Sequence, residues 1–351
     1  MRTGLFLFLI MALNSLWLAS KPAYAQSNAK PDITSGASRS VKVTSWQLTK
    51  FSKGEKGTTV RYGKLKWLGG LVLSANDPAF GGYSGIEISP DGKRFVAVSD
   101  AGTWLAGDIT YKLGRISGVR NTRIGSLKAL GNKNLRRRRD RDAEAIRLVS
   151  GDLISGSALI SFEINQRIGV FPIRSGQIAG PIRYLRPGRR MPPNKGLESV
   201  ALVGRQIPGR QRDVIAFAER SRDRNGHHQG FLWRGGRKKP QPLALVDLQG
   251  FDVTDAVGLD DGRLLVLERR FRWSEGIKMR VREIAANRLR PGAVVTGKTL
   301  LQADLQYEID NMEGIAVHSN QSRRTILTLI SDNNFNAFLQ RTLILQFAMP
   351  T

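Results

Sequence analysis

The sequence predicts an all-β protein that folds as a single β-propeller of about five four-stranded blades. Three observations support this prediction. A short motif recurs five times at a near-constant period, a second β-prone run follows each copy, and the last repeat lacks a strand that an N-terminal segment can supply. Repeats of this length that hold four short strands are typical of propeller blades.

The motif consists of a polar residue, a small residue, Ile or Val, any residue and another aliphatic residue. The copies read YSGIEI, AEAIRL, LESVAL, TDAVGL and MEGIAV, and their polar residues are Ser84, Glu144, Glu198, Asp255 and Glu313. These positions lie 60, 54, 57 and 58 residues apart, which is too regular for chance. We expect each copy to form the innermost strand of one blade.

A run rich in β-branched and apolar residues follows each copy and carries an acid at its far end. These acids are Asp100, Glu163, Glu219, Glu268 and Asp332. Turn-forming stretches such as SPDGK and DDGR separate several copies from the run that follows, which predicts β-hairpins. The two runs should therefore form the first and second strands of each blade.

The last repeat has only three strand-like runs before the chain ends. The segment KLKWLGGLVLS, from Lys64 to Ser74, precedes the first motif and has no blade of its own. We expect it to complete the last blade and close the ring, because closure removes exposed strand edges. The segment from Val41 to Phe51 leaves room for a degenerate sixth blade.

Residues 1–25 have the features of a secretory signal peptide: a basic Arg2, an apolar stretch from Gly4 to Ala19, and an A-x-A site that ends at Ala25. Residues 26–40 are polar and form an expected disordered lead-in, and residues 41–351 form the propeller domain. We therefore expect a periplasmic or secreted protein that is cleaved after Ala25. An uncleaved membrane anchor is the alternative. The absence of cysteine excludes disulfides and thiolate metal sites.

The chain is strongly basic, with 55 Lys and Arg residues against 29 Asp and Glu residues and a net charge of +26. Loss of Arg2 and Lys21 with the signal peptide would leave +24. Such a field favours anionic partners, namely phosphorylated or other anionic small molecules and anionic envelope polymers. We expect no nucleic acid partner, because export separates the protein from it, and we expect a monomer.

The acids of the repeat should gather at one mouth of the central channel. The first strand of a blade begins where the second strand ends, so the residues at both places face the same end of the ring. The nine predicted carboxylates are Glu144, Glu198, Asp255, Glu313, Asp100, Glu163, Glu219, Glu268 and Asp332. Clustered carboxylates repel one another unless cations intervene, and calcium takes 6–8 oxygen ligands in irregular geometry. The alternative is that each acid pairs with a neighbouring arginine.

Basic residues near the same mouth are candidates for binding phosphate or carboxylate. The loops that enter the first strands are arginine-rich in two places, and two arginines directly follow predicted acids. The candidates are Arg138, Arg139, Lys195, Arg220 and Arg269. Guanidinium groups bind such anions through paired hydrogen bonds. The histidines His227 and His228 fall in a predicted loop that faces this mouth, where we expect exposed side chains or, alternatively, acid–base groups.

The stretches DAEAI, LESVAL, NMEGIA and LISDNNF resemble the phytase-like family of exported bacterial proteins, which is labelled for the esterase-like activity of phytase. The resemblance extends from about Leu71 to Phe347 and implies a β-propeller that hydrolyses phosphoric esters. β-Propeller phytases use calcium in an acidic channel, but this chain has Asn76 where the similar stretch of those enzymes has an acid. The expected function is therefore an exported phosphate-ester hydrolase assisted by a divalent cation. The alternative is a non-catalytic periplasmic propeller that binds an anionic ligand, an envelope polymer or a protein partner.

Overall fold

The computed structural model describes residues 38–350, except positions 55–59, 189–190, 193–195, 206, 208, 210 and 321. The predicted signal peptide and residues 26–37 of the predicted lead-in lie outside the described residues. Within these described ranges, no helix is long and apolar enough to span a bilayer.

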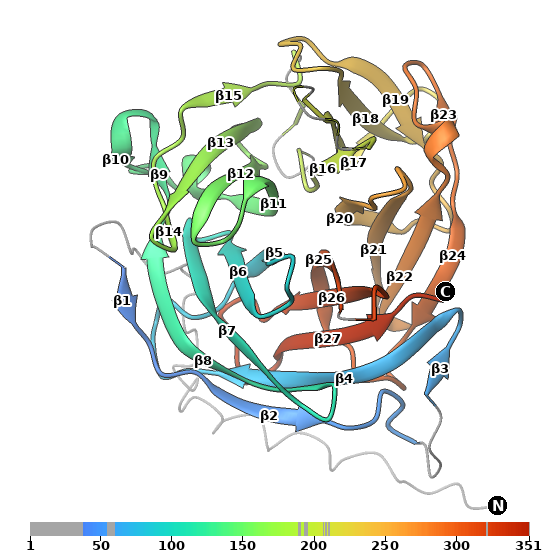
Figure 1. Cartoon of the computed structure of the whole chain (residues 1–351). Helices are drawn as coiled ribbons and strands as arrows, with labels where there is room; N and C mark the ends of the chain where they lie inside the picture. Colours follow the sequence, from blue (N-terminus) through green and yellow to red (C-terminus); the bar gives the residue numbers. More distant parts are fainter. Residues whose placement is uncertain are drawn as a thin grey trace, which may run out of the picture.

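The described chain forms five β-sheets arranged as blades around a central axis, which confirms the predicted propeller (Figure 1). Blade 1 contains β5 (Tyr83–Ile88), β6 (Arg94–Ser99), β7 (Thr103–Lys112) and β8 (Arg115–Ser126), with β1 (Arg39–Ser40) at its edge. Blade 2 contains β11 (Ala143–Gly151), β12 (Ser155–Phe162), β13 (Arg167–Arg174), β14 (Gln177–Ile178) and β15 (Arg183–Leu185). Blade 3 contains β16 (Ala201–Val203), β17 (Asp213–Arg222), β18 (His228–Trp233), β19 (Gln241–Leu245) and a parallel β23 (Val294–Val295).

Blade 4 contains β20 (Asp252–Gly258), β21 (Leu264–Arg272), β22 (Gly276–Ile284) and β24 (Lys298–Ala303). Blade 5 contains β25 (Asn311–Ser319), β26 (Thr325–Asp332), β27 (Thr342–Ala348), β4 (Leu65–Ser74) and β2 (Thr44–Leu48), and β3 (Arg61–Tyr62) pairs with β4. The connection from blade 1 to blade 2 holds the hairpin of β9 (Lys128–Ala129) and β10 (Lys133–Asn134) and the one-turn helix α1 (Arg138–Arg141).

The ring closes through blade 5, as predicted. The N-terminal strand β4 pairs antiparallel with the C-terminal strand β27, from Thr342 opposite Leu73 to Ala348 opposite Lys66. The segment considered for a sixth blade instead contributes β2, which pairs with β4 as the outermost strand of blade 5. A single five-residue strand cannot bury a face of its own, so it adds to an existing sheet.

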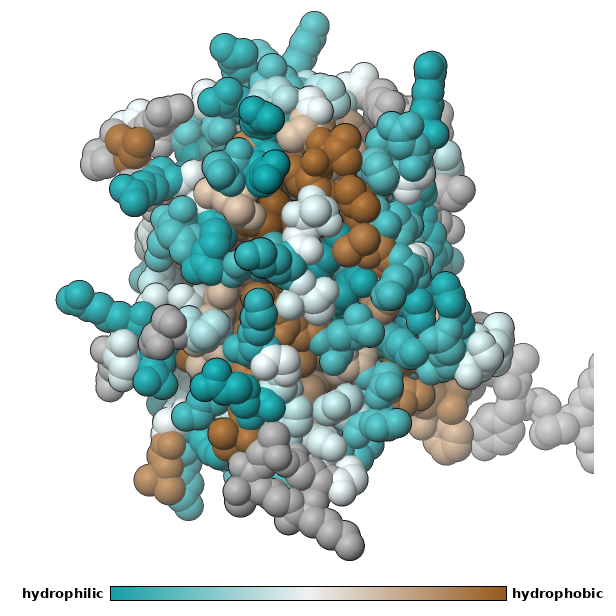
Figure 2. Space-filling view, turned by 90° about the vertical axis from the view of Figure 1, so that its right-hand side faces the viewer, coloured by the Kyte–Doolittle hydropathy of each residue, from teal (hydrophilic) through white to brown (hydrophobic). Residues whose placement is uncertain are grey.

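Five hydrophobic clusters fill the spaces between neighbouring blades. Side chains alternate along each middle strand, so one strand serves two clusters. On β12, for example, Ala158 and Ile160 pack against blade 1, whereas Leu159 packs against blade 3. The outer wall seen in Figure 2 is largely hydrophilic, with hydrophobic patches between the polar side chains. The apolar residues of the repeat therefore hold the blades together.

The innermost strands approach one another closely near the axis. A Cβ atom placed on Gly314 would lie 3.0 Å from the backbone of Gly85 on the next blade, and one on Gly85 would lie 2.7 Å from Ala145. The small residue of the motif therefore permits contact between backbones of adjacent blades.

An ion pair crosses the axis below this level. Arg147 of blade 2 donates to the carboxylate of Asp255 of blade 4 at 2.5 Å, and also to the carbonyl oxygens of Ile86 and Ala256. Both side chains are buried. We call this contact the axial ion pair; it joins blade 2 to blade 4 at the centre of the ring.

Candidate functional site

A cavity of about 690 Å³ opens at one end of the ring, above the axial ion pair. Its walls are the starts of the first strands and the ends of the second strands, which is where the repeat predicts the polar positions. Its lining residues include Ser84, Asp100, Arg138, Arg139, Asp142, Glu144, Glu163, Glu198, Glu219, Arg269, Asn311, Glu313, Asp332 and Asn334. We call this cavity the mouth.

The structure brings seven of the nine predicted carboxylates to the mouth: Asp100, Glu144, Glu163, Glu198, Glu219, Glu313 and Asp332. In blades 1, 2 and 5 the first position of the motif coincides with a break in the strand register, which turns Ser84, Glu144 and Glu313 toward the cavity. Asp142 joins them one position before β11.

Blade 4 departs from the prediction by one residue. Val253 lies opposite Glu268 and the register shift falls at Thr254, whereas in blade 5 Met312 lies opposite Ser331 and the shift falls at Glu313. Thr254 and Arg269 therefore occupy the places that Glu313 and Asp332 occupy in blade 5. Successive side chains of a strand point to opposite faces, so a slip of one residue turns the two predicted acids away from the mouth.

Both displaced acids form buried ion pairs. Asp255 pairs with Arg147 in the axial ion pair. Glu268 accepts a hydrogen bond from Arg280 at 2.8 Å and another from Arg282, and it is fully buried. The expectation that these two carboxylates lie at the mouth is wrong, and for them the structure supports the alternative of pairing with arginine.

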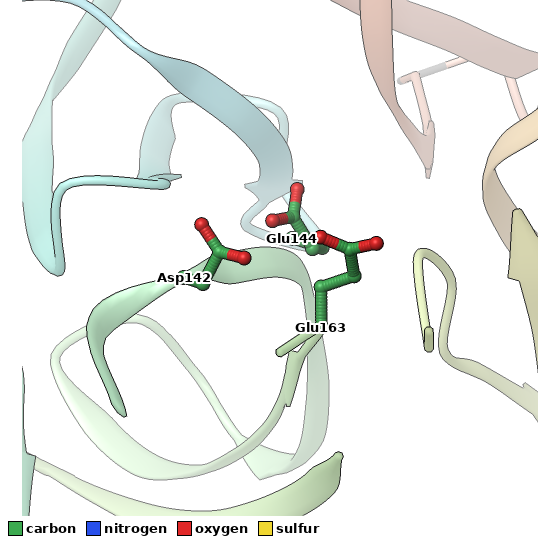
Figure 3. A group of neighbouring side chains, drawn as sticks. All are labelled: Asp142, Glu144 and Glu163. Atoms are coloured by element: carbon green, nitrogen blue, oxygen red, sulfur yellow. The ribbon is translucent and has the colours of Figure 1, made fainter. Parts of the chain in front are cut away.

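The mouth contains two groups of carboxylates close enough to share a cation. In the first group, Asp142, Glu144 and Glu163 each offer an oxygen atom within 4.8 Å of the others (Figure 3). Glu163 also forms the second group with Glu198 and Glu219. Oxygen atoms bound to one calcium ion at 2.3–2.6 Å lie at most about 5 Å apart, so an all-oxygen donor set at this spacing fits a hard divalent cation.

Burial and mutual repulsion raise the pKa of these carboxyl groups. Burial raises the pKa of Glu163 to about 7, and the negative charge of Asp142 adds to the shift. Burial also raises the pKa of Glu219 to about 7, although Arg220 and Arg269 oppose it. The pKa of Glu198 lies well above its ordinary value because of burial and the neighbouring Glu144 and Glu219. A cation would stabilise the ionised form of all these groups.

Arg269 places a positive charge on one side of the mouth. Its guanidinium lies 3.0 Å from Glu313 and 3.5 Å from Glu219, and it also contacts the side chain of Asn311. This charge results from the slip in blade 4, which puts Arg269 at the place that Asp332 occupies in blade 5. An anion that enters the mouth would therefore meet the guanidinium of Arg269 beside the carboxylates of Glu219 and Glu313.

The other predicted basic residues differ in position. Arg138 and Arg139 line the mouth from helix α1 and are exposed. Arg220 lies outside the lining and pairs with Asp252 at 2.8 Å and Glu219 at 3.3 Å. Lys195 lies outside the described residues.

The position of His228 differs from the predicted loop that faces the mouth. It lies buried on β18, and its Nδ1 is 2.8 Å from the carbonyl oxygen of Glu219 and 2.8 Å from Arg222. Its Nε2 is 3.0 Å from the carbonyl oxygen of Phe251. This side chain holds the backbone that carries Glu219 and does not reach the cavity lining. The bulge of β17 beside it, between Phe217 and Arg222, gives no sequence signal.

Comparison with known proteins identifies a family for this chain. No curated protein matches the chain. The sequence profile of the phytase-like family, described as "esterase-like activity of phytase", matches residues 78–335. This match covers more than two thirds of the chain and includes every carboxylate of the mouth. The chain therefore belongs to the phytase-like family.

Proposed function

We propose that this protein is an exported hydrolase that cleaves a phosphate ester at the mouth with the assistance of a divalent cation, calcium being the best fit. Membership of the phytase-like family supports a hydrolase-type function. The observation that carries the finer proposal is the pair of carboxylate groups that share Glu163 within a cavity large enough for a small phosphorylated molecule.

The residues of the mouth divide into two roles. Asp142, Glu144, Glu163 and Glu198 would hold the cation, because their oxygen atoms converge and their burial makes an ionised cluster costly without one. A bound divalent cation would polarise a phosphoryl oxygen and a water molecule and would offset the charge that develops during hydrolysis. Arg269 would bind the phosphate group from the wall formed by blade 4, and Arg138 and Arg139 would attract it from the rim.

The buried axial ion pair lies at the centre of the ring, beyond the mouth residues. Arg147 of this pair lies three residues after Glu144 along β11. Substrate and product would enter and leave on the same side, past the exposed arginines of α1.

The test is release of phosphate from phytate and from an aryl phosphate, measured with calcium and after chelation. We expect turnover that depends on calcium, and an increase in melting temperature when calcium is added. Replacing Glu144, Glu198 or Glu313 by Gln should reduce turnover, whereas Asp261→Asn, at a solvent-exposed turn outside the mouth lining, is the matched control and should leave turnover unchanged. No turnover with any divalent metal, together with no thermal shift by calcium, would reject the proposal and favour a binding propeller.

A further inference from the structure

The strands that carry mouth residues continue into turns with large exposed apolar side chains. Beyond Arg269, β21 runs into the turn to β22, where Phe271 and Trp273 pack edge to face with ring centres 5.5 Å apart. Beyond Asp332, the loop between β26 and β27 holds Phe338 and Leu339. Trp273 and Phe338 are each 95% exposed, and no other described aromatic residue is exposed to this degree. Both therefore project from the mouth face of the ring.

A third loop connects these two turns. The residues after β24 include the exposed Leu305, which lies against the β21–β22 turn at Gly276. In the same loop, Glu308 accepts a hydrogen bond from Arg341 at 2.9 Å, which ties it to the loop between β26 and β27. The five apolar side chains of this region, which we call the apolar tips, are Phe271, Trp273, Leu305, Phe338 and Leu339.

The apolar tips are accompanied by positive charge. In the β21–β22 turn a single carboxylate, Glu275, receives three cations: Arg270 at 2.5 Å, Lys278 at 2.6 Å and Arg272 at 3.0 Å. Elsewhere on the same face, residues 136–139 are four consecutive exposed arginines, two of which line the mouth. The face that carries the apolar tips is thus positively charged on either side of the cavity.

We propose that the mouth face docks on an anionic lipid bilayer, with the apolar tips inserted among the lipids. Side chains that stand singly on separate turns can each enter a lipid surface, and Trp and Phe beside Arg and Lys are favoured at the boundary between headgroups and acyl chains. Basic residues beside them gain energy from an anionic leaflet. Docking would point the mouth at the headgroups. It does not require hydrolysis, so it can hold or fail independently of the proposed function.

The test uses the absence of cysteine from the chain, which allows one label at a chosen position. A polarity-sensitive fluorophore is attached to Phe338→Cys and, as the matched control, to Leu113→Cys, which is equally exposed on the β7–β8 turn at the opposite face. The full chain is then mixed with vesicles of phosphatidylglycerol and phosphatidylcholine. We expect a blue shift and quenching by lipid-borne quenchers for the label at position 338, and neither for the label at position 113.

A second comparison measures the contribution of one tip. Trp273→Ala should weaken partition into the anionic vesicles on the order of tenfold, as expected for withdrawing one large aromatic side chain. Trp46→Ala, an exposed tryptophan on the outer strand β2, is the control and should change partition little. The proposal is overturned if the emission of both labels shows that they remain in water, which is the result expected if the surface binds a protein partner instead. It is also overturned if the emission of both labels shifts equally. Equal partition by Trp273→Ala and wild type would also overturn it.

Discussion

Replacing Arg147 by Met tests the importance of the axial ion pair. The Arg147 side chain is 3% exposed, and it donates to Asp255 at 2.5 Å and to the carbonyl oxygen of Ala256 at 2.7 and 3.0 Å. It also reaches the carbonyl oxygen of Ile86 at 3.1 Å, so it joins blades 1, 2 and 4. The substitution leaves these carbonyl groups without this donor and leaves a buried carboxyl group without its counter-ion.

The expected loss follows from the contacts. Removing one partner of a buried ion pair costs about 3–5 kcal/mol, and each buried carbonyl left without a donor adds about 1 kcal/mol. Two effects reduce the sum. The carboxylate of Asp255 keeps the amide donors of Ile315 at 2.9 Å and Ala256 at 2.8 Å, and burial raises its pKa to about 7, so it can become neutral at modest cost. We therefore expect Arg147→Met to lower the free energy of unfolding by about 3–5 kcal/mol.

Urea unfolding followed by far-UV circular dichroism measures this loss. The matched control is Arg94→Met, because Arg94 lies 3.7 Å from Asp108 at the surface with a side chain 44% exposed, and such pairs contribute about 0–1 kcal/mol. The double variant Arg147→Met, Asp255→Asn should lose less than the sum of its single variants. A loss below about 1 kcal/mol for Arg147→Met, or one equal to that of the control, would refute the assigned role.

Three further predictions concern other parts of the ring. Burial lowers the pKa of His318 to about 4, so this one histidine should contribute a loss of up to a few kcal/mol to wild-type stability as the pH falls from about 6.5 toward 4, because only the unfolded chain then takes up its proton. His318→Gln should remove that loss in urea midpoints measured at both ends of this range, and an unchanged pH dependence would contradict the assignment. Gly314→Val should lower the free energy of unfolding by about 1–3 kcal/mol, seen as a lower melting temperature, because its Cβ would lie 2.7 Å from Ile330. Arg269→Gln should raise KM for a phosphate ester by about tenfold or more with an unchanged circular dichroism spectrum, whereas an unchanged KM would remove Arg269 from the binding site.

The repeat alone is enough to predict a β-propeller of about five blades. The motif marks the innermost strands because small residues such as Gly314 are needed where backbones meet near the axis. The strand at Leu65–Ser74 is predictable because the last repeat lacks a fourth strand and this run has no blade of its own. The role of the segment around β2 was not predictable, since its sequence suits both a new blade and an added edge.

The candidate site was predictable only in part, and blade 4 shows the reason. TDAVGL matches the motif by residue type, with an acid at the position that matches Glu313. The register of a strand pair is set by packing on both faces, and Asp255 finds its partner in Arg147, which is 108 residues away in the sequence. The residues around Asp255 in the sequence give no indication of a partner so far away in the chain. The same slip brings the side chain of Arg269 to the mouth. One change of register therefore explains both the wrong prediction for Asp255 and Glu268 and the presence of Arg269 in the site.

The pairing of β4 with β27 also governs when the ring can form. These strands lie at opposite ends of the described chain, so their contact requires closing a loop that contains nearly the whole domain. Long-range pairing of this kind is slow, because the chain loses its freedom before the contact is made. During synthesis, four blades can assemble in order, but blade 5 must wait until Thr342–Ala348 has emerged. A shortened chain that stops before Thr342 would expose β26 as an unpaired edge, so loss of the last ten residues should lead to aggregation rather than to a smaller propeller.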